Sequence, residues 1–312
     1  MDKYPPGQKD LITRRSFMKG AAYGSLGLVA GLHRLAPGAA AAGLQPDAFA
    51  AADPLARIVL VREEAAVDAA HAVDSKIVAA MVDRAVMTLA GVEDPLQAWG
   101  LYVKREDTVG VKITRCEWMR VHTEQAVVDA VLARLEALGI PKERVHTMDG
   151  GLPVKDCTVL INVPSIKVHS LTGIACSIKN YINFSSKPSA YHFNGNTKLA
   201  ETFLLPEVKG KTRLIIVDAL RPYFGPGPQI NPLHRWDYKG VMAATDPVAV
   251  DTTALKLCEE KRRLFKKGED WPITPPPRFL AAADMDYKLG TSDPAKIRVE
   301  KLGFSGEILI GA

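Results

Sequence analysis

The chain has 312 residues, of which 47% are hydrophobic and 24% are charged, with 40 Lys and Arg against 35 Asp and Glu. Residues 1–50 hold six basic and three acidic residues, which leaves a nearly balanced 34 basic and 32 acidic residues after them. This balance argues against nucleic acid as a partner. No apolar run after residue 50 reaches the roughly 18 residues that a membrane span needs, so we expect no stable transmembrane segment after processing.

The first 50 residues carry an export pattern. Residues 13–19 read TRRSFMK, which matches the S/T-R-R-x-F-L-K motif of twin-arginine signals with Met18 in the Leu position. Residues 21–32 are weakly apolar and too short to cross a hydrocarbon core of about 30 Å. Alanine-rich stretches at 39–42 and 48–50 offer A-x-A cleavage sites.

We therefore predict that residues 1–50 are a signal peptide and linker recognised by the twin-arginine translocase. Residues 51–312 are then a single domain in the periplasm or another extracytoplasmic compartment. The alternative is that the basic N-terminal segment forms an amphipathic helix belonging to the fold.

After residue 50, segments with apolar residues at strand spacing alternate with segments at helix spacing. In chain order, the pattern predicts a strand over 56–61, a helix over 75–89, a strand over 108–113, a helix over 123–138, strands over 144–148, 158–163, 213–218 and 239–244, and a helix over 246–261. Asp94-Pro95 interrupts this pattern, and Pro-rich stretches predict loops at 225–232 and 272–277. The alternation predicts an α/β layered fold with a mostly parallel sheet flanked by helices.

Polar residues lie where these strands end. In open α/β sheets, ligands bind outside the carboxyl ends of the strands. Lys112 and Asn162 lie near two such ends, Asp149 and Asp218 near two others, and Asp246 follows the last predicted strand. We expect these side chains to line a polar cleft.

The densest polar cluster spans residues 167–180. Lys167 and His169 are two residues apart, so on an extended segment they share a face. We expect residues 172–173 to turn the chain into a helix with Lys179 and Asn180 on its second turn. Free N–H groups at the helix start, together with the two lysines, then predict a site for phosphate or carboxylate.

Two acidic residues introduce the last predicted helix. Asp246 precedes a proline suited to the first helical position, so an N-cap is its simplest role. Asp251 lies one turn deeper among apolar residues, where a carboxylate is costly unless a cation or metal meets it. Lys112, Lys167 or Lys179 can supply that cation. A divalent metal held by His169 and nearby carboxylates is a further possibility, although no metal-binding spacing supports it.

The four cysteines are Cys116, Cys157, Cys176 and Cys258, all widely spaced. Without local clustering, no iron–sulfur cluster is expected. Two disulfides in any of three connectivities and four buried thiols both remain open. His192, between two aromatic residues, is interpreted as a packing residue of a loop.

Several short motifs together resemble a known family. They are Val111-Lys112, INVP at 161–164, KVHSLTG at 167–173, SIKN at 177–180, VDA at 217–219 and ATDPVAVD at 244–251. The chain resembles the domain of unknown function 362 family, whose members are often exported and sometimes fused to ferredoxin-like iron–sulfur modules. The resemblance implies no settled activity, and the cluster-binding cysteines of the fused members are absent here. The chain also departs in having Thr114-Arg115 after Lys112.

Two hypotheses follow. As a redox-associated enzyme using an external electron carrier, the protein binds a small anionic substrate through Lys167 and Lys179. His169 then acts as general acid or base near neutral pH, and Asp218 or Asp246 orients it or holds a cation. As a non-catalytic periplasmic protein, it binds such a ligand or helps assemble a redox partner. The predicted ligand-binding residues are Lys112, Asp149, Asn162, Ser170, Thr172, Asn180, Asp246 and Asp251.

Overall fold

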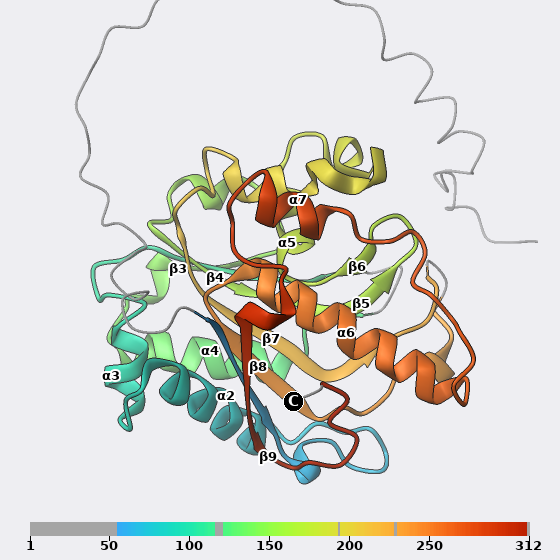
Figure 1. Cartoon of the computed structure of the whole chain (residues 1–312). Helices are drawn as coiled ribbons and strands as arrows, with labels where there is room; N and C mark the ends of the chain where they lie inside the picture. Colours follow the sequence, from blue (N-terminus) through green and yellow to red (C-terminus); the bar gives the residue numbers. More distant parts are fainter. Residues whose placement is uncertain (1–54, 116–120, 193, 228–229, 311–312) are drawn as a thin grey trace, which may run out of the picture. The chain divides into compact units, whose positions relative to one another are not determined.

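The computed structural model describes residues 55–115, 121–192, 194–227 and 230–310 (Figure 1). The predicted signal peptide and Cys116 lie outside these ranges.

A nine-stranded sheet forms the centre of the fold, in the order β3-β2-β4-β7-β8-β1-β9, with β5 attached to β7 and β6 to β5. The strands are β1 (Ala56–Arg62), β2 (Val109–Ile113), β3 (Val145–Met148), β4 (Val159–Val163), β5 (Ser165–His169), β6 (Gly173–Ala175), β7 (Thr212–Tyr223), β8 (Gly240–Ala244) and β9 (Ile297–Gly303). Five of the pairings are parallel and three, β1 with β8, β7 with β8 and β5 with β6, are antiparallel. The predicted mostly parallel α/β sheet is confirmed.

Helices cover both faces of the sheet. They are α2 (Ser75–Ala90), α3 (Pro95–Gly100), α4 (Gln125–Ala137), α5 (Ser177–Asn180), α6 (Pro247–Phe265) and α7 (Phe279–Met285). The helices α2, α3 and α4 lie on one face, and α5, α6 and α7 lie on the other (Figure 1). Short 3₁₀ helices span Glu64–Ala66, Lys142–Arg144, Leu152–Lys155, Tyr181–Phe184, Pro188–His192, Asn194–Leu204, Pro232–His234 and Pro294–Lys296.

The alternation of side chains along β2 and β4 directs polar groups to one face. Val109, Val111 and Ile113 pack in the core under α2 and α4. Lys112 therefore faces the layer that contains α5 and α6, because successive side chains point to opposite faces. Asn162 is opposite Lys112 in the parallel register and faces the same layer.

The segment after β5 differs from its prediction. Residues 172–173 do not start a helix; Thr172 ends the turn between the antiparallel strands β5 and β6, and Gly173 is the first residue of β6. Gly173 has φ +78°, and a Cβ there would lie 2.4 Å from the Pro275 carbonyl oxygen, so only glycine fits this turn. The helix α5 starts at Ser177, which puts Lys179 and Asn180 in its first turn.

The strand predicted over 213–218 is also longer than expected. It continues to Tyr223 as β7 and places Asp218 in its interior, because residues 219–223 go on pairing with β8 and β5.

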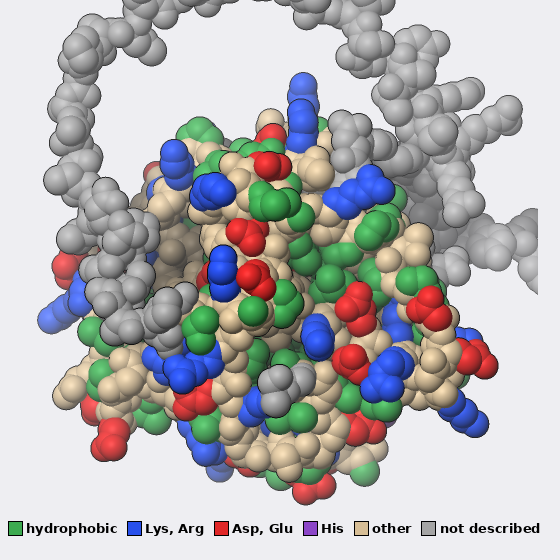
Figure 2. All heavy atoms as spheres, in the orientation of Figure 1, with side chains coloured by type: hydrophobic (Ala, Val, Ile, Leu, Met, Phe, Trp, Pro, Cys, Tyr) green, Lys and Arg blue, Asp and Glu red, His purple; other side chains and the backbone are tan. Residues whose placement is uncertain are grey.

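The surface over α6 and α7 carries Lys and Arg interspersed with Asp and Glu (Figure 2). Among the described residues, no helix combines the length and apolar character that crossing a bilayer requires.

Candidate functional site

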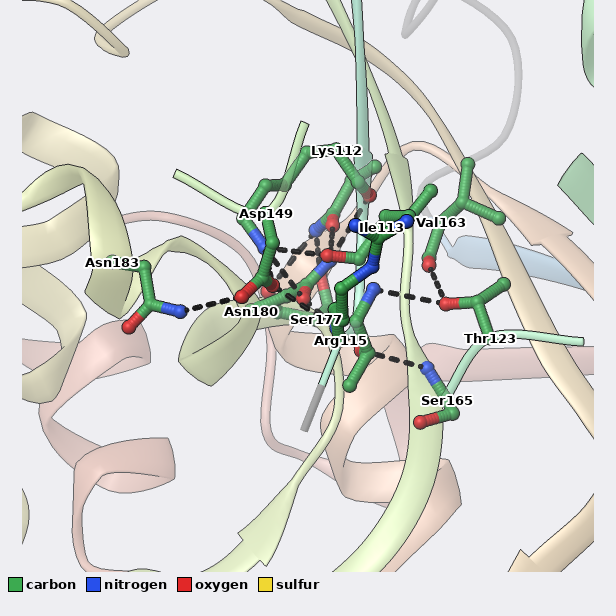
Figure 3. A network of polar contacts seen from close by, with 12 residues as sticks. Lys112, Ile113, Arg115, Thr123, Asp149, Val163, Ser165, Ser177, Asn180 and Asn183 are labelled. Carbon is green, nitrogen blue, oxygen red and sulfur yellow. Dashed lines mark hydrogen bonds and ion pairs between the residues drawn. The ribbon is translucent and has the colours of Figure 1, made fainter. Parts of the chain in front are cut away.

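A buried polar network joins β2 and β4 to α5 (Figure 3). We call it the Asn180 network; it consists of Lys112, Thr114, Asp149, Asn162, Ser177 and Asn180. Lys112, which is 0% exposed, donates from Nζ to Asn180 Oδ1 at 3.0 Å, to Asp149 Oδ1 at 2.9 Å and to the carbonyl oxygen of Ile113 at 2.6 Å. These three acceptors use all three protons of the ammonium group.

Asn180 is the centre of this network. Its Oδ1 also accepts from Thr114 Oγ1 at 3.0 Å, and its Nδ2 donates to the Lys112 carbonyl at 3.1 Å and to Asn162 Oδ1 at 2.7 Å. Asn162 in turn donates from Nδ2 to the carbonyl and hydroxyl oxygens of Ser177, each at 3.0 Å. Every donor and acceptor of the Asn180 side chain is satisfied, so this network fastens α5 to the carboxyl ends of two strands.

Burial lowers the pKa of Lys112 to about 8, against the opposing effect of Asp149. The charge on Lys167 lowers it further, which shows that the two lysines lie within electrostatic reach of each other. Asp149 is 29% exposed and also accepts from Arg115 N at 3.1 Å and Asn183 Nδ2 at 2.9 Å. The ion pair is thus buried at Lys112 and partly exposed to solvent at Asp149.

Asp251 occupies the start of α5. Its carboxylate accepts from Ser177 N at 2.5 Å and Ile178 N at 3.0 Å. The sequence predicted a helix starting at 172–173 with N–H groups facing a ligand. At the observed start of the helix, the Asp251 carboxylate occupies the position expected for that ligand, and backbone donors rather than a lysine satisfy it. Burial raises the pKa of Asp251 to about 7, although both N–H groups lower it.

Two other acidic residues also accept from backbone N–H groups. Asp246 Oδ1 accepts from Val248 N and Ala249 N, each at 2.8 Å, which confirms the predicted N-cap. Asp218 accepts from Glu124 N at 2.7 Å, at the start of α4, and from Leu220 N at 2.9 Å. Burial raises the Asp218 pKa to about 6. Its carboxylate is directed to the face covered by α4, so it is not brought into the Asn180 network on the opposite face.

A second group of side chains lies beside this network. We call Lys167, His169, Lys179 and His192 the His169 cluster. Lys167 and His169 are each 6% exposed, while Lys179 and His192 are half-buried. Lys167 Nζ donates to Ser165 Oγ at 3.2 Å, and Ser165 N donates to Thr114 Oγ1 at 3.2 Å. The cluster and the network are therefore connected through Ser165, which accepts at its hydroxyl and donates from its backbone N–H, and the Thr114 hydroxyl.

The two histidine rings of the cluster are stacked. Their centroids are 5.8 Å apart and their planes differ by 7°. His169 Nδ1 accepts from Leu171 N at 3.2 Å, which assigns the ring hydrogen of the neutral form to Nε2. Thr172 in the same turn donates from Oγ1 to the Ile174 carbonyl at 3.0 Å, and Ser170 lies between them, half-buried.

Burial and neighbouring cations keep both rings neutral. The pKa of His169 falls to about 2, first because of burial and then because of Lys179, His192 and Lys167. The pKa of His192 falls to about 4 through burial and Lys179. Lys179 thus lies within electrostatic reach of both rings, and Lys167 within reach of His169. His169 does not titrate near neutral pH in these surroundings, in contrast to its predicted behaviour.

The cysteines and carboxylates supply no metal site within the described ranges, where no three His, Cys, Asp or Glu side chains are grouped suitably for a metal ion. Cys157, Cys176 and Cys258 are buried free thiols, which excludes the alternative of two disulfides.

Residues 113–256 match the sequence model of a family described as Domain of unknown function (DUF362). The chain contains a DUF362 domain. The matched range includes the whole His169 cluster and most of the Asn180 network, with Lys112 directly before it, and it confirms the family resemblance seen in the short motifs. No curated protein and no solved structure matches the chain.

Sequence reasoning about the DUF362 domain missed one member of the cluster. His192 is 23 residues from His169 along the chain, and a 3₁₀ helix at Pro188–His192 brings it back onto that ring. No periodicity or motif marks such a contact. Only the aromatic neighbours of His192 suggested a packed position.

Proposed function

We propose that this DUF362 protein binds a small anionic ligand at the His169 cluster. One observation carries the proposal: Lys179 lies close enough to the stacked rings of His169 and His192 to depress the pKa of both, and Lys167 adds to the effect on His169. Cations and N–H donors collected in a partly dehydrated place favour a negatively charged group. A protein gains nothing for its own stability from such crowding of like charges.

Binding accounts for the arrangement better than acid–base catalysis does. A general acid or base works best with a pKa near the working pH. His169 instead presents a neutral ring whose Nδ1 is occupied by Leu171 N and whose Nε2 carries a hydrogen. Such a ring serves as a hydrogen-bond donor to an anion. Association with a redox partner stays a prediction from the family resemblance.

Binding is tested by titrating the purified protein with a panel of small anions in a calorimeter. Lys179→Met should weaken the binding of any ligand found by about ten- to a hundredfold, because one charge-assisted contact of roughly 1.5–3 kcal/mol is lost. Lys187→Met, which removes an exposed lysine from the same part of the chain, is the matched control and should bind like the wild type. Equal affinity in wild type and Lys179→Met rules out the cluster as the binding site.

Turnover separates the two classes of function. If a reaction is found, His169→Gln should reduce affinity and leave the rate at saturation within a few-fold, since the amide retains a donor. A large loss of that rate with unchanged affinity would instead restore the acid–base role of His169.

Export is the second part of the proposal, and it is supported by the TRRSFMK motif at residues 13–19. Changing Arg14 and Arg15 to Lys should leave a folded precursor in the cytoplasm, as cell fractionation would reveal. Normal periplasmic accumulation of this double variant rejects the twin-arginine route. A mature N-terminus between residues 41 and 51 is expected if either A-x-A site is cleaved.

A further inference from the structure

A group of aromatic rings outside the proposed anion site surrounds Phe224, which follows β7 and is 1% exposed. The centroid of its ring lies 5.2 Å from that of His234, 5.4 Å from Trp236, 5.2 Å from Phe265 and 6.1 Å from Trp271. Edge contacts between such rings stabilise their packing beyond the area they bury. The rings therefore join the loop after β7, the end of α6 and the segment after α6 into one packed unit.

Three large apolar side chains at the border of these rings face solvent. Leu233 is 74% exposed, Leu264 43% and Phe265 44%. Leu233 precedes His234, whose ring centroid is 5.3 Å from that of Phe265, so the three side chains lie near one another. Every residue from 263 to 270 is exposed, which means that the end of α6 projects from the fold. Apolar side chains grouped in this way indicate a contact surface. We call the five rings, together with Leu233 and Leu264, the Phe224 patch.

Cations surround the Phe224 patch. Arg262 is buried with its guanidinium 4.5 Å from the centroid of Trp271, and it donates to backbone carbonyl oxygens. Lys266 Nζ lies 5.7 Å from the centroid of the same ring, and Lys266 and Lys267 are both exposed. The acidic residues 269–270 offset part of this charge. The patch thus combines projecting apolar side chains with a moderately basic border.

We propose that the Phe224 patch docks the protein on the surface of an anionic phospholipid bilayer. Leu233 and Phe265 enter the acyl-chain boundary, and Lys266 and Lys267 lie at the level of the phosphate groups. Projecting apolar side chains suit a lipid layer because acyl chains separate around each of them, whereas a peptide partner is held in a groove. Trp271 is of the ring type that is enriched where lipid meets water. This docking is independent of the proposed anion site.

Co-sedimentation of the full-length protein with vesicles tests the apolar contact. The wild type should bind vesicles of equal parts phosphatidylcholine and phosphatidylglycerol more strongly than phosphatidylcholine alone, and added salt should weaken this binding. Leu233→Asp and Phe265→Asp should each lower the partition coefficient at least about tenfold, since a charge replaces a side chain that enters the lipid. Leu96→Asp changes a similarly exposed residue of α3, 40% exposed, and should bind like the wild type.

The role of the basic border is tested in the same assay. Lys266→Gln combined with Lys267→Gln should lower binding to the mixed vesicles roughly tenfold, because two cations near the lipid surface are lost. Binding to phosphatidylcholine alone should not change. Lys76→Gln combined with Lys187→Gln removes two exposed lysines from other elements and is the matched control. Equal wild-type binding to both kinds of vesicle overturns the role of the head-group charge.

Hydrogen exchange locates the contact on the chain. Residues 1–50 are basic and partly apolar, and such a segment can bind lipid by itself. It is present in every variant, so the comparisons above do not depend on it. Mixed vesicles should slow amide exchange in residues 232–236 and 263–271. Protection confined to residues 1–50 overturns the proposal.

Other outcomes reassign the patch. Absence of binding to the mixed vesicles, or binding that Leu233→Asp and Phe265→Asp leave unchanged, overturns lipid docking. Melting temperatures like that of the wild type show that these exposed substitutions leave the fold intact. A wild-type dimer in light scattering that Phe265→Asp dissociates assigns the patch to a contact between two copies of the chain. Binding of polyglutamate without lipid, abolished by the same substitutions, assigns it to an acidic peptide. Either of these results also overturns the lipid proposal, and neither affects the proposed anion site.

Discussion

The Asn180 network and the His169 cluster lie side by side and contain similar side chains, yet they differ in whether their polar atoms have hydrogen-bond partners. In the Asn180 network, each proton of Lys112 and each polar atom of the Asn180 side chain has a partner. In the His169 cluster, cations depress the pKa of neighbouring rings and His192 Nε2 has no partner among the described residues. The polar atoms of the first region are satisfied by one another, whereas the second holds a buried ring nitrogen without a partner in the described part of the chain, which is why we place the proposed ligand there.

The largest expected effect comes from the centre of the network. Asn180→Ala removes four hydrogen bonds and leaves buried partners on Lys112, Thr114 and Asn162 unsatisfied. We expect a loss of about 3–5 kcal/mol in the free energy of unfolding, measured by urea denaturation. Asn183→Ala removes only one exposed contact with Asp149 and should cost less than about 1 kcal/mol. Similar losses in the two variants would contradict the distinction drawn here.

A smaller effect is expected from the pH dependence of Asp251. Its pKa rises from 3.8 to about 7 on folding, so its contribution to stability is fully present below about pH 4 and is lost as pH rises through 7. Between pH 5 and 7 the wild type should lose about 2 kcal/mol more stability than Asp251→Asn does. Urea denaturation of both proteins at several pH values measures this difference, and parallel curves would show that Asp251 does not titrate as its burial implies.

The smallest change in stability should follow from Lys179→Met. This substitution removes one of the cations that crowd the two rings, so the free energy of unfolding should change by less than about 1 kcal/mol or rise. The pKa of His192 should rise toward its ordinary value, as measured by NMR titration of the imidazole protons. A severe loss of stability would show that Lys179 belongs to the supporting framework, like Lys112.

Much of the fold could be predicted from the sequence, because apolar residues recur at regular spacing along the long helices and strands. The helices α2, α4 and α6 and six of the strands follow directly from apolar spacing. The strand β9 was not predicted, since its side chains are half-buried or exposed and give a weak pattern. The short strands β5 and β6 were missed because a three-residue turn and long-range pairing with β7 define them.

The rule that ligands bind at strand ends pointed to Lys112, Asn162, Lys167 and Asn180, but it did not predict which of them are fully bonded to one another. That distinction depends on whether each buried atom has a partner, and partners such as Thr114 and Asp149 come from distant segments. The same limit concealed the role of Asp251, whose backbone donors lie more than 70 residues away. Sequence patterns identify polar residues in apolar surroundings, and only the fold shows what satisfies them.

The position of β1 has a consequence for how the chain is made. Residues 56–62 lie between β8 and β9, and so pair only with residues 240–244 and 297–303. During synthesis, this strand emerges from the ribosome long before either neighbour exists, so the sheet is completed only when the last described strand has been translated. We expect ribosome-bound chains that stop before residue 240 to remain sensitive to protease. Resistance should appear only after residue 303 has emerged, because the two neighbours of β1 are then both present.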